Sequence, residues 1–65
     1  MEIKESKILD EYARGWELSQ KEKPFPDWFK TETEKQACLL GYMAYDTGVV
    51  RTNEEIIKEV KRIVK

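Results

Sequence analysis

The chain has 65 residues and carries 12 Lys and Arg against 13 Asp and Glu, for a net charge of -1. This length allows a single domain over residues 1–65 with one hydrophobic core, and it excludes a second domain. The near balance of charges excludes a general attraction to nucleic acid or to an anionic membrane, so any such binding requires a local patch.

The single cysteine, Cys38, and the absence of histidine limit how so small a domain is stabilised. No internal disulfide can form and an ordinary zinc site lacks its ligands, so we expect no metal and no cofactor. A secreted domain of this size usually contains disulfides, and no signal-peptide pattern follows Met1, so the cytoplasm is the expected compartment. The longest run without a charged or strongly polar side chain, residues 37–45, is much shorter than the roughly 20 residues that cross a bilayer, so no membrane association is expected.

Residues 5–21 are predicted to form the first helix, because their apolar side chains repeat with the period of one helical face. These side chains are Ile8, Leu9, Tyr12, Ala13 and Trp16. Opposite charges four residues apart, such as Lys7 with Glu11 and Asp10 with Arg14, are typical of a solvated outer face.

Residues 21–30, KEKPFPDWFK, interrupt the helical pattern, because both prolines lack a backbone donor. The second helix is predicted to begin with a capping box formed by Thr31 and Glu34, and to end at Gly48 in a left-handed conformation. Its apolar side comprises Ala37, Leu40, Gly41 and Ala44, with Leu39 and Met43 beside them.

Two glycines lie inside the predicted helices, Gly15 in the first and Gly41 in the second. A glycine in a helix interior costs about 0.5–1 kcal/mol relative to alanine, so a neighbouring backbone is expected to come close at each position. We therefore expect the first two helices to cross tightly at these residues.

A third helix is predicted from a second capping box, formed by Thr52 and Glu55. Its apolar stripe is the most regular in the chain and is expected to dock on the first two helices. The stripe comprises Ile56, Ile57, Val60, Ile63 and Val64. We therefore predict an all-α fold, a compact three-helix domain in which the first two helices form an antiparallel hairpin joined by a Pro/aromatic loop.

No catalytic site is recognisable, and we do not expect an enzyme. Without histidine, acid–base chemistry near neutral pH would fall to carboxylates whose pKa is raised by burial. The acidic pairs are sequence neighbours that we expect to be exposed: Asp10 with Glu11, Glu32 with Glu34, and Glu54 with Glu55. Cys38 lies among apolar residues and is expected to be a small buried side chain rather than a reactive thiol.

The loop before the second helix contains three large aromatic side chains within five residues, Phe25, Trp28 and Phe29. Two interpretations are open: at least one of them covers the end of the helix pair, or they form a proline-stiffened binding surface. Tyr42 and Tyr45 on the second helix either extend that surface or pack half-buried. We take these five residues as the candidate partner-binding site, with Trp28 as the first candidate for its anchor.

The third helix is basic toward its end, through Lys58, Lys61, Arg62 and Lys65. The second helix, the Gly48 turn and the third helix loosely resemble a helix-turn-helix. A recognition helix contacts bases from its N-terminal residues, which here are Glu54 and Glu55 and would repel phosphate. DNA binding is therefore not expected, and compensation of the helix dipole explains the basic residues.

The motifs Arg14-Gly15-Trp16, Pro24-Phe25-Pro26 and Leu40-Gly41-Tyr42 are similar to the pattern of ribosome modulation factor, a family of small two-helix bacterial proteins. The resemblance spans residues 11–45 and implies a helical hairpin with close contact between the two glycines. It also implies association with ribosomal RNA. That family is strongly basic, whereas this chain is slightly acidic. The spacing between its first two helices is also shorter, and it adds a third helix.

The sequence therefore predicts a small, non-enzymatic module that binds another protein. Its size and charge are typical of the proteins with which bacteriophages and mobile elements bind and modulate a host protein. A ribosome-associated, RNA-binding modulation factor and a helix-turn-helix DNA-binding regulator are the alternatives, and self-association is open.

Overall fold

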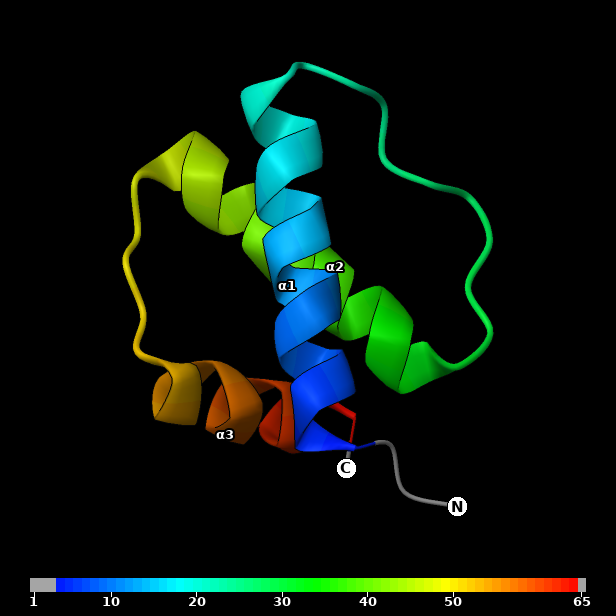
Figure 1. The fold of residues 1–65 in the computed structure, drawn as a ribbon, viewed down its shortest axis with the longest axis vertical. Helices are drawn as coiled ribbons and strands as arrows, with labels where there is room; N and C mark the ends of the chain where they lie inside the picture. The colour runs from blue at the N-terminus through cyan, green and yellow to red at the C-terminus, as the bar shows by residue number, and fades with distance from the viewer. Residues whose placement is uncertain (1–3, 65) are drawn as a thin grey trace.

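The computed structural model describes residues 4–64, which form three helices: α1 (Glu5–Gln20), α2 (Glu32–Thr47) and α3 (Asn53–Ile63) (Figure 1). No strand occurs within these residues. The predicted all-α, three-helix class is confirmed, and α1 and α2 form the most extensive contact in the fold.

Local sequence signals fix the ends of the helices. Thr31 Oγ1 accepts a hydrogen bond from the Glu34 amide, and Glu34 Oε1 accepts one from the Thr31 amide, each at 3.2 Å. Thr52 and Glu55 form the same reciprocal pair at the start of α3, at 3.2 and 3.0 Å. Gly48 follows α2 with a φ of 74°. Both predicted capping boxes and the predicted left-handed stop are confirmed.

The backbones of α1 and α2 touch at the two helical glycines. A Cβ atom on Gly15 would lie 2.8 Å from the carbonyl carbon of Cys38 and 2.9 Å from the backbone nitrogen of Tyr42. A Cβ atom on Gly41 would lie 2.8 Å from the carbonyl carbon of Tyr12. Side-chain Cβ atoms do not approach other heavy atoms so closely. The close crossing predicted from the glycines is confirmed.

The direction of this crossing differs from the antiparallel arrangement that the sequence pattern predicts. Lys7 and Glu34, both near the start of their helices, form an ion pair, and the rings of Trp16 and Tyr45, both near the end, are in contact. The two helices therefore run in the same general direction as they cross, and the loop between them returns along the outside of the pair (Figure 1).

The length of that loop permits this arrangement, and its prolines favour it. At a rise of 1.5 Å per residue, α1, with its 16 residues, is about 24 Å long. Residues 21–31 can span about 36 Å when extended, which is enough to return along the whole of α1. The two prolines in this segment favour extended backbone over a compact turn.

The core forms where α1, α2 and α3 meet. Its buried residues are Ile8, Tyr12, Ala37, Leu40, Ala44, Ile56 and Val60, with Leu9, Trp16 and Ile57 packed against them. The third helix lies across the start of α1 (Figure 1), where Lys61 pairs with Glu5 at 3.1 Å. Ile63 keeps 42% of its surface exposed, so the prediction that the whole stripe docks is wrong at this residue. The stripe is wider than the surface that the crossed pair offers.

Candidate functional site

The structure separates the five candidate binding residues into three groups. Phe25, Phe29 and Tyr42 are partly buried, Trp28 is 74% exposed, and Tyr45 is 39% exposed. Their contacts determine which of them hold the loop in place and which are available to a partner.

Phe25, Phe29 and Tyr42 fasten the loop to α2. The ring of Phe25 lies 5.5 Å from that of Phe29 and 5.5 Å from that of Tyr42, the latter in an edge-to-face arrangement. The Tyr42 hydroxyl donates a 2.6 Å hydrogen bond to the backbone carbonyl of Lys23. These three aromatics therefore hold the loop against α2.

Trp28 projects from the loop that these contacts hold. It is the most exposed aromatic side chain in the loop, although its neighbours Phe25 and Phe29 are partly buried. A tryptophan exposed on a supported loop loses little backbone freedom when it binds, because the surrounding contacts have already ordered the chain. Trp28 is thus the residue of the candidate set that is best placed for recognition.

Tyr45 does not join the loop aromatics. Its ring packs edge-to-face on Trp16, with centroids 5.2 Å apart. Trp16 lies two positions after Arg14 on α1, and residues two apart point to different sides of a helix. Arg14 lies at the loop side, with its guanidinium carbon 5.9 Å from the centre of the Phe29 ring. Tyr45 is therefore packed on Trp16, and within residues 4–64 no ring contact joins it to the loop aromatics.

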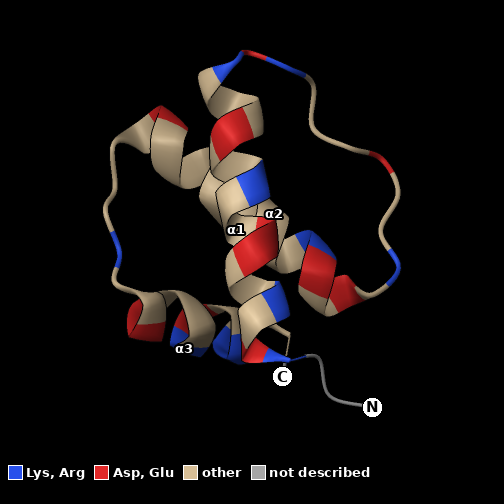
Figure 2. Ribbon diagram, viewed as in Figure 1, with Lys and Arg blue, Asp and Glu red and all other residues tan. Residues whose placement is uncertain are grey.

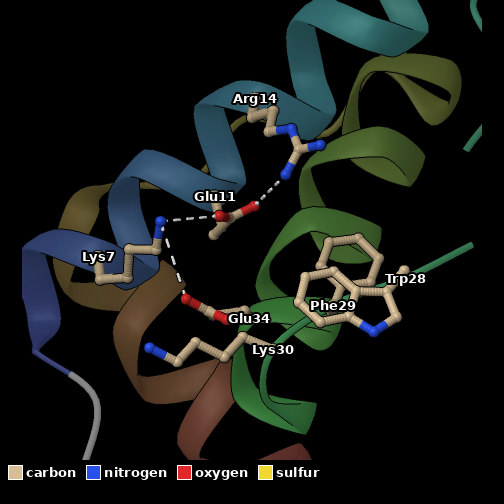
Figure 3. Close-up of a pocket in the computed structure, with 7 residues that line it drawn as sticks. All are labelled: Lys7, Glu11, Arg14, Trp28, Phe29, Lys30 and Glu34. Carbon is tan, nitrogen blue, oxygen red and sulfur yellow. Dashed lines mark hydrogen bonds and ion pairs between the residues drawn. The ribbon is translucent and has the colours of Figure 1, made fainter. Parts of the chain in front are cut away.

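A shallow hollow of about 300 Å³ lies between α1, the start of α2 and the loop (Figure 3). Charged and aromatic side chains line it: Lys7, Glu11, Arg14, Trp28, Phe29, Lys30 and Glu34. We call this the α1–loop hollow. It brings the predicted residues Trp28 and Phe29 together with four charges from the two helices and with Lys30.

Glu11 is the buried charge of this hollow, at 6% exposure. Its Oε2 lies 3.1 Å from Lys7 Nζ, and its Oε1 lies 3.4 Å from Arg14 Nη1. The expected pair of Lys7 with Glu11 is present, whereas Arg14 pairs with Glu11 instead of Asp10. The prediction that Glu11 is exposed is wrong. Its carboxylate, and more weakly that of Glu34, raises the pKa of the Lys7 ammonium.

The burial of Glu11 follows from the helix crossing. Glu11 precedes Gly15 by four residues and therefore lies on the same face of α1, one turn before the point where the two backbones touch. The close approach of α2 covers this turn as well. The signal was present in the spacing between Glu11 and the glycine, but it can be read only once Gly15 is known to lie at the crossing.

A second hollow, of about 270 Å³, shares Trp28, Phe29 and Lys30 with the first. Loop residues and the first turn of α2 line it, including Asp27, Lys30, Glu32 and Lys35. Trp28 therefore lines two shallow depressions, and both also contain charged residues. Its indole can lie against a partner segment that enters either of them.

Cys38 is fully buried, and burial raises the pKa of its thiol, so the expectation of a small buried side chain is confirmed. Within residues 4–64, no group of three or more His, Cys, Asp and Glu side chains is placed to hold a metal ion. Across the same residues, no helix has the length and apolar character needed to cross a bilayer.

A comparison of the chain with protein-family models, with curated proteins and with solved structures found no match. The arrangement of the side chains themselves is therefore the basis for assigning a function.

Proposed function

We propose that this chain is a small protein-interaction module that binds a partner protein through Trp28 and the α1–loop hollow beside it. The observation that carries the proposal is the 74% exposure of Trp28 on a loop whose other aromatics are packed against α2. Tryptophan is enriched among residues that dominate binding energy, because it buries a large area at little cost in side-chain entropy.

The charges on the surface favour a protein partner over nucleic acid. Basic and acidic positions are interspersed along the ribbons of α1 and α3 (Figure 2). The start of α3 presents Glu54 and Glu55, both exposed, where a DNA-reading helix would need donors or cations. Binding to ribosomal RNA would also require a basic surface.

The small size and the near balance of charge fit a module that binds and modulates a host protein, as bacteriophage and mobile-element proteins do. The lone, buried Cys38 and the lack of any disulfide support action in the cytoplasm. We propose no catalytic step for this chain.

Affinity capture with matched variants tests the proposal. Immobilised wild-type protein is exposed to a host lysate beside Trp28→Ala and the control Val50→Ala, which removes another exposed apolar side chain, 86% exposed, from a different loop. We expect Trp28→Ala to weaken capture by about 2 kcal/mol or more, about 30-fold, while Val50→Ala does not.

Thermal melting, followed by circular dichroism, shows whether the variant is folded. We expect Trp28→Ala to melt close to the wild type. Capture that survives the substitution would remove Trp28 from the site, and loss of the fold would assign it to the core. Co-sedimentation with ribosomes that does not depend on Trp28 would favour the RNA-binding alternative.

A further inference from the structure

The acceptors in the α1–loop hollow are already engaged within the chain. Glu11 uses one carboxylate oxygen for Lys7 at 3.1 Å and the other for Arg14 at 3.4 Å. Glu34 accepts from the Thr31 amide at 3.2 Å, and its second oxygen lies 3.8 Å from Lys7 Nζ. The two glutamate side chains are only 7% and 12% exposed, so they offer little to a ligand.

The donors of the same hollow are only partly used. Arg14 contacts Glu11 through Nη1 alone, and its side chain is 52% exposed, so most of its guanidinium N–H groups face outward. Within the part of the chain that the structure describes, Lys30 is exposed and forms no ion pair, and the indole N–H of Trp28 has no acceptor. Figure 3 shows Arg14 beside Glu11 and the Lys30 ammonium near Glu34, so that both glutamates lie between the two cations in this view, with Trp28 and Phe29 to one side.

We infer that the α1–loop hollow binds an acidic segment of the partner protein, with carboxylates on the outward-facing donors of Arg14 and Lys30 and an adjacent apolar side chain on Trp28. The inference rests on the proposed function and adds the chemistry of the partner. Since the unused hydrogen-bonding groups are donors, the ligand must supply acceptors. The guanidinium of Arg14 is a planar fork that matches a carboxylate, and its carbon lies 5.9 Å from the centre of the Phe29 ring, which restricts its orientation.

An acidic peptide fits this surface better than a nucleic acid does. In the second hollow the acidic residues Asp27 and Glu32 balance the basic residues Lys30 and Lys35, so this hollow offers no net attraction to the continuous row of phosphates in a nucleic acid. A peptide can place carboxylates on the donors and an apolar residue on Trp28 without extending negative charge over Asp27. The side chains around Trp28 therefore favour a peptide that carries an acidic residue beside an apolar residue.

Selection from a random-peptide display library tests this chemistry without a known partner. The immobilised wild-type chain is the bait, and Trp28→Ala is the counter-bait. We expect enrichment of peptides that carry Asp or Glu next to a large apolar residue and that are lost on Trp28→Ala. Enriched peptides that depend on Trp28 but lack acidic residues would overturn the inference and leave the proposed function intact. Absence of any Trp28-dependent peptide would overturn both.

Measurements on one enriched peptide then identify the groups that receive the carboxylate. Changing its acidic residue to the amide should weaken binding to the wild type by about fivefold, as expected for a partly exposed charge pair. The same change in the peptide should have little effect on its binding to the Lys30→Gln variant of the protein. The folded Arg14→Gln variant should give the same result. Lys58→Gln, at an exposed position on α3 outside the hollow, is the control and should respond like the wild type.

An equal loss in the wild type and in Lys30→Gln would show that this cation does not receive the carboxylate and would overturn the inference. Short single-stranded RNA is the second probe. RNA that binds more tightly than the acidic peptide and competes with it would assign the hollow to nucleic acid instead.

Discussion

Replacing Gly15 by alanine should destabilise the domain, although alanine is the better helix former. The added Cβ would lie 2.8 Å from the carbonyl carbon of Cys38 and 2.9 Å from the backbone nitrogen of Tyr42. Both are backbone atoms of α2, so the clash is relieved only by moving a helix. Overpacking costs about 1–3 kcal/mol and helix propensity returns about 0.5–1 kcal/mol, so the middle of the two ranges leaves a net loss of about 1 kcal/mol. For a domain of this size, the melting temperature should fall by about 4–8 °C.

The contribution of helix propensity can be measured in the same helix. Ala13 is exposed on α1, so Ala13→Gly should lose about 0.5–1 kcal/mol from propensity alone. Gly41→Ala should resemble Gly15→Ala, because its Cβ would meet the backbone of Tyr12. The double variant should lose less than the sum of the single losses, because the first Cβ already separates the helices that the second would push apart.

Urea and thermal unfolding, followed by circular dichroism, provide the free energies for this set of variants. If Gly15→Ala is more stable than the wild type by the amount that Ala13→Gly loses, then nothing opposes the Cβ and the two backbones do not touch at Gly15. Additive losses in the double variant would likewise contradict a single crossing shared by both glycines.

Other parts of the fold give shorter tests. Tyr12→Phe should stabilise the domain by about 1 kcal/mol in urea unfolding, because the buried Tyr12 hydroxyl has no hydrogen-bond partner among the described atoms. Truncation after Arg51 should abolish the sharp thermal transition, since the remaining helix pair would lose Ile56 and Val60 from the core. Cys38 should react with a thiol reagent only after unfolding, as its burial and raised pKa require. Hydrogen bonds from Thr52 lower the pKa of Glu55, so stability should fall as the pH drops through that pKa, and Glu55→Gln should remove this part of the pH dependence.

Features that depend on local chemistry could be predicted from the sequence. The starts of α2 and α3 follow from threonine and glutamate at the capping-box spacing, which satisfy each other's groups without help from the rest of the fold. The crossing follows from Gly15 and Gly41, since a glycine inside a helix requires a compensating contact.

Features that depend on how the helices are placed in space were harder to predict. The length of residues 21–31 allowed either a wide turn or a return along α1, and the apolar periodicity of the two helices does not specify their relative direction. The burial of Glu11 and the contact of Tyr45 with Trp16 follow from that direction, because it decides which turn of α1 faces which turn of α2. Local patterns therefore gave the elements and the contact point, whereas the surface around Trp28 required the arrangement of both helices.

Backbone amide hydrogen exchange of the chain, alone and bound to its captured partner, locates the binding surface independently of any substitution. We expect added protection in residues 25–30, in the adjoining first turn of α2 and around Arg14, with little change in α3. Protection that is confined to α3 or to the loop around Val50, with residues 25–30 unchanged, would contradict a binding surface centred on Trp28.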